Sequence, residues 1–300
     1  MNLTNQLILS VIRLLPRPVV RRFAMRYIAG EQLDDAVRVV RALNSKNIMG
    51  TIDVLGENVS TREESLAAIR GCEEVLHSIN QNHIEANLSI KLTQFGLKID
   101  EEFCYSNVKR LLEIASGYNQ FVRIDMEDSS TTSDTLKLYE RLRSDGFENV
   151  GVVIQANMRR SEKDIQRLIS MKPNVRLCKG AYIEPESIAF RGREEIRFIF
   201  LRLFEMLLDA KCYVGIATHD DFLTHSAYQY IQESNLQKSK YEFQMLYGVR
   251  SKLRDQIVAD GHRLRVYVPF GQHWYAYSMR RFKENPQIIR YVFRALFSGD

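Results

Sequence analysis

Short β-rich runs alternate with amphipathic segments along most of this 300-residue chain. The segments between the runs are charged and repeat their apolar residues with helical spacing. Two of them open with patterns typical of capping boxes, Ser60 with Glu63 and Ser161 with Asp164. The eight predicted strands are residues 48–54, 86–92, 121–126, 150–155, 175–180, 213–218, 242–247 and 264–268. Strand followed by helix, eight times over, predicts an α/β fold of the (β/α)8 TIM-barrel type.

Nothing in the sequence divides this pattern into separate domains. The six prolines are scattered, and no repeat or low-complexity tract interrupts the chain. We therefore expect one catalytic barrel over residues 47–300, preceded by an N-terminal helical segment over residues 1–46. Apolar residues 7–15 of that segment precede three arginines that end at position 22. An accessory helix packed on the barrel explains this pattern, and an amphipathic helix at a membrane surface is the alternative.

The composition excludes several classes of protein. Apolar residues make up 45% of the chain and charged residues 26%, as in ordinary globular domains. No apolar run approaches the ~20 residues that cross a bilayer, and no signal-peptide cleavage site follows the N-terminal apolar patch. The net charge of +5 is too small and too scattered to indicate nucleic-acid binding. We expect a cytoplasmic location, with peripheral contact with the inner face of the membrane as an alternative.

Several motifs of nucleotide and metal sites are absent from the sequence. No two glycines are separated by a single residue, so any nucleotide cofactor must bind outside a Rossmann domain. The histidines lack the H-x-x-x-H spacing of a helical zinc site, and no G-x-S-x-G elbow is present. The cysteines are too far apart for a C-x-x-C pair; they are Cys72, Cys104, Cys178 and Cys212. The sequence predicts no metal site and reduced thiols.

Polar side chains stand at the end of every predicted strand. They are Asp53 with Glu57, Lys91, Asp125, Gln155, Arg176 with Lys179, Thr218 with His219, Gln244, and Tyr267. The active site of a (β/α)8 barrel lies where its strands end, at the carboxyl-terminal mouth. A single charge at such a place is more often a helix cap or an ion pair than a catalyst. Convergence of Lys91, Asp125, Arg176 and Lys179 on one rim nevertheless favours an active site.

Two strand-end segments have alternative explanations. Residues 176–182 end a strand with two cations and a glycine, which suits a phosphate or cofactor ring and equally suits an ordinary Lys-Gly turn. Residues 217–221 carry a hydroxyl, an imidazole and two carboxylates. Taken alone, Asp220 or Asp221 is better explained as a helix N-cap than as a ligand.

The chain after residue 271 is predicted to form a helix with Tyr277 and Arg280 or Arg281 on one face. Guanidinium groups bind a carboxylate through two parallel hydrogen bonds. The two adjacent arginines therefore suit a small carboxylate, and a solvated surface pair is the alternative.

Seven motifs, in order from about residue 48 to 286, resemble the monofunctional bacterial type of the proline dehydrogenase family. They are Ile90-Lys91-Leu92, Ile124-Asp125-Met126-Glu127, Ile154-Gln155-Ala156, Arg176-Leu177-Cys178-Lys179-Gly180-Ala181-Tyr182-x-Glu184-Pro185, Ala217-Thr218-His219-Asp220, Phe243-Gln244-Met245-Leu246-Tyr247-Gly248 and Tyr277-x-x-Arg280-Arg281. The resemblance implies a flavoenzyme that oxidises L-proline to Δ1-pyrroline-5-carboxylate, the first step of proline catabolism to glutamate. Non-covalent FAD would take the hydride, and a membrane quinone would accept the electrons.

The same resemblance implies a role for individual residues. Asp125 and Arg176 would be catalytic, with Arg176 at flavin N5. The residues implied to bind substrate are Lys91, Arg280 and Arg281 at the carboxylate, Tyr267, Tyr277, Tyr182 and Leu246 around the ring, and Glu57 as a gate that pairs with Arg280. The residues implied to bind FAD are Met126, Gln155, Arg176, Lys179, Gly180, Ala181, Thr218, His219 and Glu284. The departures are modest: Cys178 stands where the family usually has valine, and Asp220 where some members have asparagine.

Two other functions remain open from the residues alone. A Schiff-base lyase or aldolase on the same barrel would use Lys91 or Lys179 as its nucleophile. A non-catalytic barrel would bind an anionic ligand or a membrane through its positive charge. Flavin content and turnover of proline distinguish the three hypotheses.

Overall fold

The computed structural model describes residues 17–275 and 277–279, and its centre is a closed barrel of eight parallel strands in chain order. The strands are β1 (Met49–Val54), β2 (Ala86–Ile90), β3 (Val122–Ile124), β4 (Val150–Gln155), β5 (Asn174–Cys178), β6 (Tyr213–Ala217), β7 (Tyr241–Leu246) and β8 (Leu264–Phe270). Pairing of β1 with β8 closes the barrel, with Thr51 opposite Tyr267. The predicted (β/α)8 fold is confirmed, and each strand lies at its predicted place.

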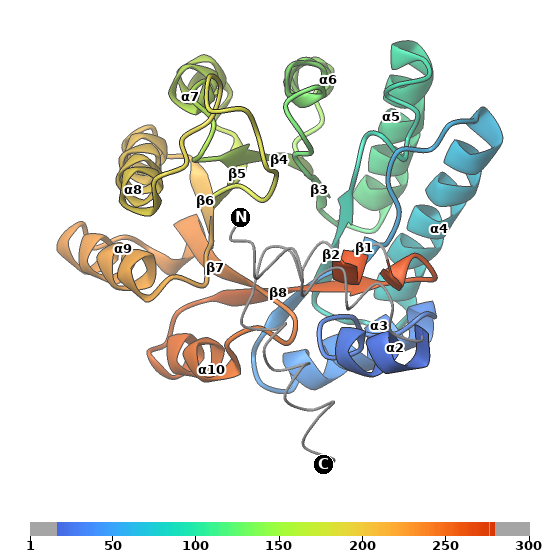
Figure 1. Cartoon of the computed structure of the whole chain (residues 1–300), viewed down its shortest axis with the longest axis horizontal. Helices are drawn as coiled ribbons and strands as arrows, with labels where there is room; N and C mark the ends of the chain where they lie inside the picture. The colour runs from blue at the N-terminus through green and yellow to red at the C-terminus, as the bar shows by residue number, and fades with distance from the viewer. Residues whose placement is uncertain (1–16, 276, 280–300) are drawn as a thin grey trace.

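Helices surround the barrel (Figure 1). They are α2 (Arg17–Ala24), α3 (Leu33–Asn44), α4 (Arg62–Gln81), α5 (Glu101–Gly117), α6 (Thr132–Ser144), α7 (Ser161–Leu168), α8 (Arg193–Asp209), α9 (Asp221–Glu233) and α10 (Ser251–Ala259), with 3-10 turns at η1 (Ile169–Met171) and η2 (Lys238–Lys240). Residues 274, 275 and 277–279 are helical, as predicted for the segment after residue 271. In the part of the chain that the structure describes, no helix is both long and apolar enough to cross a bilayer.

The strands place apolar side chains outside the barrel and polar ones inside. Buried aliphatic residues such as Leu88 and Val152 form one core with the helices. Contacts between strands that are not neighbours identify the interior side chains: Arg123 of β3 binds Asn174 of β5, and Arg176 of β5 lies 3.4 Å from Ser89 of β2. The barrels of this class are usually filled by layers of branched apolar side chains. Most interior side chains of this one are polar, and Val153 is an apolar exception.

The two predicted capping boxes differ from the structure. Helix α4 is capped one residue later than predicted: Glu64 N–H donates to the Thr61 hydroxyl, and the Glu64 carboxylate accepts from Thr61 N–H. Thr61 rather than Ser60 has the extended backbone that an N-cap needs. Ser161 lies inside α7, where its hydroxyl donates to the Gln155 carbonyl, and Asp164 pairs with Arg160.

The N-terminal segment takes part in the barrel's outer shell. Helix α3 packs against β8 and β1, so it covers the seam where the barrel closes. Val20 and Ala24 of α2 form a second apolar cluster with Leu55, Trp274 and Tyr277. The boundary at residues 46 and 47 stays a prediction, and residues 7–15 of the predicted amphipathic helix lie outside the described residues.

Candidate active site

Asp125 is the central carboxylate of a polar cluster at the carboxyl-terminal mouth of the barrel. It follows β3, and its Oδ1 accepts from Arg176 Nη1 at 2.6 Å and from Ser89 Oγ at 2.7 Å. Its Oδ2 accepts from the Tyr267 hydroxyl at 2.7 Å. Side chains of β2, β5 and β8 therefore converge on one carboxylate, as the topology predicts for residues at strand ends.

Lys91 lies between two carboxylates in the same cluster. Its Nζ is 2.6 Å from Asp53 Oδ1 and 3.8 Å from Asp125 Oδ2. The Tyr267 hydroxyl is 3.4 Å from the same nitrogen. Lys91 is 6% exposed and Asp53 only 1%, so this pair is screened very little by water.

Burial and neighbouring charges set the protonation states of the cluster. Burial alone would lower the pKa of Lys91, but Asp53 and Asp125 outweigh it and raise that pKa well above its ordinary value. Burial opposes ionisation of Asp125, yet Arg176 and Lys91 outweigh it and lower the pKa of that carboxyl group. Burial and the nearby carboxylates raise the pKa of Tyr267 far above 10.0. Lys91 is thus a cation, Asp125 an anion and Tyr267 a neutral hydrogen-bond donor.

Arg176 is held in place by a chain of hydrogen bonds that runs down the barrel interior. Its Nε donates to Gln244 Oε1 at 2.6 Å, and Gln244 Nε2 donates to Glu242 Oε1 at 2.6 Å. Glu242 in turn accepts from Arg265 Nε at 2.7 Å. Arg176 Nη2 makes no hydrogen bond with any described residue, so it remains available to a ligand at the mouth.

The backbone after β5 packs closely against the Asn157 side chain. Gly180 has a φ of +109°, and a Cβ at this position would lie 2.0 Å from Asn157 Oδ1, so only glycine fits. Gln155 fixes the next residue, because its Oε1 accepts from the Ala181 N–H at 3.3 Å. Its Nε2 donates to the Glu127 carbonyl at 3.0 Å, next to buried Met126. These predicted flavin residues therefore form one rigid stretch of the mouth.

Lys179 does not join the Lys91 cluster, which corrects the predicted convergence of four charged residues. Its Nζ lies 3.1 Å from Asp220 Oδ2. Because Lys179 follows the last residue of β5, its side chain is no longer directed by the strand and pairs with the start of α9 instead. Asp220 also binds Arg197 at 2.6 Å. The predicted N-cap is confirmed, since Asp220 accepts from the Phe222 N–H at 3.1 Å.

Thr218 and His219 are tied to the backbone of the same loop. The Thr218 hydroxyl accepts from the Asp220 N–H at 3.1 Å. The Leu246 N–H donates to His219 Nε2 at 2.8 Å, so this nitrogen carries no proton. His219 therefore links the mouth of β6 to that of β7.

The remaining predicted residues fall into two groups. Half-buried Glu57, Tyr182 and Leu246 and buried Tyr277 belong to the mouth or to the segments beside it. Glu57 is close enough to Lys91 to contribute to its raised pKa. Three predicted residues lie outside the described part of the chain: Arg280, Arg281 and Glu284.

Sequence analysis named Asp53 and Gln244 only as polar strand-end residues, and it did not name Ser89 or Glu242. Residues two apart on a strand point to the same side of the sheet. Ser89 precedes Lys91 by two residues, and Glu242 precedes Gln244 by two, so this spacing could have identified both. Among residues 17–275 and 277–279, no three His, Cys, Asp or Glu side chains are grouped as metal ligands.

Comparison with known proteins agrees with this geometry. The sequence profile of the family described as proline dehydrogenase matches residues 36–290. Proline dehydrogenase 1 of Bacillus subtilis subsp. natto is 36% identical over 273 residues, which cover 91% of this chain and 90% of that protein. Proline dehydrogenase of Deinococcus radiodurans is 33% identical over 289 residues, with 95% and 93% covered.

A solved structure shares the fold. It is proline utilization A (PutA) from Bdellovibrio bacteriovorus, inactivated by N-propargylglycine, with a TM-score of 0.82 and 24% identity. The match covers 88% of this chain and 33% of that longer one. Since the profile spans most of the barrel and two full-length relatives exceed 30% identity, the chain belongs to the proline dehydrogenase family.

Proposed function

We propose that this chain oxidises L-proline to Δ1-pyrroline-5-carboxylate with bound FAD and passes the electrons to a membrane quinone. The observation that carries this proposal is the Asp125 cluster, which holds Lys91 and Arg176 at the barrel mouth in a member of the proline dehydrogenase family. An oxidoreductase of this family acts in proline catabolism.

The residues at the mouth fit FAD. Arg176 has an unused Nη2 donor, and Gly180 lets the chain turn at the mouth beside Asn157. Lys179 and Arg197 gather beside Asp220 at the start of α9, where phosphate groups find positive charge. The residues proposed to hold the cofactor are Met126, Gln155, Arg176, Lys179, Gly180, Ala181, Thr218, His219 and Glu284. When bound, FAD would supply the hydride acceptor.

The protein's own task is to orient proline and balance its charge. In this cluster Lys91 is already paired with Asp53, and Arg176 with Asp125. The carboxylate of the substrate therefore needs further positive charge, which Arg280 and Arg281 are proposed to supply together with Lys91. The residues proposed to enclose the substrate ring are Tyr182, Leu246, Tyr267 and Tyr277, with Glu57 as the gate. Such positioning can contribute ~7–11 kcal/mol to lowering a barrier.

The geometry does not favour a Schiff-base enzyme. A nucleophilic lysine needs a lowered pKa and a free amine. Lys91 has a raised pKa between Asp53 and Asp125, and Lys179 is paired with Asp220. Lys91 is thus held as an ammonium ion, and Lys179 is engaged by a carboxylate.

An anaerobic visible spectrum tests the proposed function. We expect the purified chain to be yellow and to lose its flavin absorbance on addition of L-proline. Acid precipitation should release the flavin, since no covalent attachment is proposed. A colourless protein, or a spectrum that proline leaves unchanged, would reject the proposal.

We expect Arg281→Met to raise the KM for proline strongly while flavin content stays near normal. Removing one partner of a desolvated charge pair costs ~2–5 kcal/mol, or roughly thirty-fold to several-thousand-fold in KM. Steady-state kinetics with an artificial acceptor measures this effect. Prolinamide, which lacks the carboxylate, should be a poor substrate for the wild type and lose little more in the variant. Unchanged kinetics with proline would remove the carboxylate role.

Membrane contact belongs to the same proposal, because reduced flavin must meet a lipid-soluble acceptor. Residues 7–22 of the N-terminal segment are one candidate contact surface. Peripheral contact from the cytoplasmic side stays a prediction.

A further inference from the structure

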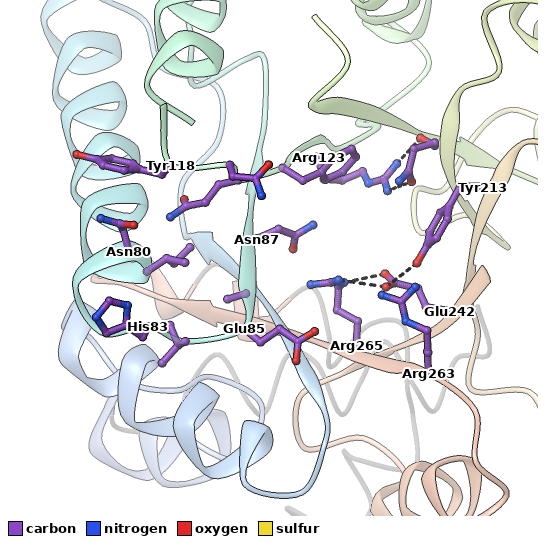
Figure 2. A pocket seen from close by; sticks show the side chains of 17 residues that line it. Asn80, His83, Glu85, Asn87, Tyr118, Arg123, Tyr213, Glu242, Arg263 and Arg265 are labelled. Carbon is purple, nitrogen blue, oxygen red and sulfur yellow. Dashed lines mark hydrogen bonds and ion pairs between the residues drawn. The ribbon is translucent and has the colours of Figure 1, made fainter. Parts of the chain in front are cut away.

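A cavity of about 490 Å³ opens at the amino-terminal end of the barrel, opposite the proposed active site. First residues of three strands line it: Ala86 of β2, Asn174 of β5 and Tyr213 of β6. Figure 2 shows it ringed by arginine, amide and tyrosine side chains. Its volume lies within the ~300–1,000 Å³ of ordinary ligand pockets.

Arg123 contributes a buried positive charge to the wall of this cavity without a carboxylate partner. The side chain is 1% exposed, and its Nη1 donates to the carbonyl oxygens of Val152 at 2.9 Å and Asn174 at 2.6 Å. Nη2 donates to the Asn174 side chain, and Nε has no partner. The guanidinium lies 4.9 Å from the Phe121 ring. Every partner is neutral, although a buried charge normally requires an opposite one.

The surroundings relieve that charge only in part, through the more distant Glu242. Burial and the positive charge of Arg176 lower the pKa of Arg123 to about 9. The nearest acid in the wall, Glu242, is fully engaged: it accepts from Arg265 at 2.7 Å and from the Tyr213 hydroxyl at 2.9 Å. Figure 2 shows both donors turned toward Glu242.

A second arginine of the wall, Arg263, is half-buried and has no ion pair among the described residues. Its Nη2 lies 3.5 Å from the Met49 sulfur. Exposed Glu85 is the one further acid among the lining residues. Beyond the Arg265–Glu242 pair, two arginines therefore face one rim carboxylate, and the cavity has an excess of positive charge.

The neutral part of the wall is polar and offers hydrogen bonds. Its amide side chains are Asn80, Asn87, Asn119, Gln120 and Asn174. Such a lining suits a hydrated, charged ligand better than an apolar one.

We propose that this cavity is a binding site for a small oxyanion, held by Arg123 and Arg263 and by the surrounding amides. The site is separate from the mouth at which proline and FAD are proposed to bind. Phosphate and small carboxylates share the chemistry that it recognises, since both accept the donors of a guanidinium group.

Equilibrium dialysis of the flavin-loaded chain against radiolabelled inorganic phosphate, at constant ionic strength, tests the proposal. We expect saturable binding of one equivalent with a Kd at or below about 1 mM. Arg263→Gln should weaken it about ten-fold, the effect of losing one charged hydrogen bond. Asn80→Asp, at an exposed position of the rim, should weaken it as well through like-charge repulsion.

Matched variants exclude binding elsewhere. Arg254→Gln makes the same change at a half-buried arginine of α10 outside the cavity, and should leave phosphate binding unchanged. Arg281→Met, at the proposed carboxylate site, should also leave it unchanged. The proposal is overturned by absence of saturable binding below about 10 mM. It is equally overturned if Arg263→Gln and Asn80→Asp bind like the wild type, or if Arg281→Met abolishes binding.

Discussion

Asp125→Asn should lower kcat/KM for proline by roughly 100- to 4,000-fold. The asparagine keeps the shape of the side chain but removes the charge that Arg176 and Lys91 share at 2.6 and 3.8 Å. Breaking a buried ion pair on one side costs ~3–5 kcal/mol, which corresponds to this range of rate. The amide group also places a donor where the Tyr267 hydroxyl already donates. Steady-state kinetics with an artificial acceptor measures the loss.

Asp164→Asn is the matched control for that variant. Asp164 is 7% exposed and pairs with Arg160 at 2.7 Å, so the same charge is removed from an ion pair in the first turn of α7, outside the Asp125 cluster. We expect its kcat/KM to stay within about two-fold of the wild type. Equal losses in the two variants would show that Asp125 acts only through stability.

Glu242→Gln should destabilise the fold by ~3–5 kcal/mol, because it leaves Arg265 without its buried anionic partner. Glu242 is 2% exposed and binds Arg265 through both carboxylate oxygens, at 2.7 and 3.1 Å. Urea denaturation followed by circular dichroism gives the difference. Glu102→Gln provides the comparison: its carboxylate pairs with Arg141 on the surface, where water screens the charges, and we expect little change.

The destabilisation by Glu242→Gln should depend on pH. Burial opposes ionisation of Glu242, but the charge of Arg265 and hydrogen bonds from Arg265, Gln244 and Tyr213 outweigh it and lower its pKa from 4.5 to about 2. A carboxyl group with a lowered folded-state pKa contributes stability above its unfolded pKa and loses it as the pH falls toward the folded one. The gap between wild type and variant should thus be constant above about pH 5 and narrow between pH 4.5 and 2. A gap that persists unchanged at pH 3 would contradict this assignment.

Much of the fold follows from the sequence because its signals are local. Runs such as Val150–Gln155 contain β-branched residues that fit a strand buried on both sides, and the charged segments between them repeat at helical spacing. Eight strand–helix repeats most commonly form a closed parallel barrel. That barrel brings Lys91, Asp125, Arg176 and Tyr267 to the same mouth.

The pairing of individual side chains could not be predicted, since it depends on how neighbouring strands are offset. The bond between Lys91 and Asp53 requires that Asp53 lie opposite Ser89, a register that no local pattern reveals. The chain from Arg176 through Gln244 to Glu242 likewise needs the offsets of β5, β6 and β7. Lys179 lies outside the cluster because it is one residue beyond the end of β5, where the strand no longer determines which way a side chain points.

The polar interior of the barrel affects the order in which the protein folds. The apolar surface that drives collapse lies between the strands and the helices. Inside the barrel, burying Arg123, Glu242 or Arg265 before its hydrogen-bond partners are in place does not lower the free energy. Contacts between β1 and β8 join segments more than 200 residues apart and are therefore slow to form. We expect the strand–helix layers to assemble around a hydrated interior, and the water inside to leave only when closure brings the last hydrogen-bond partners together.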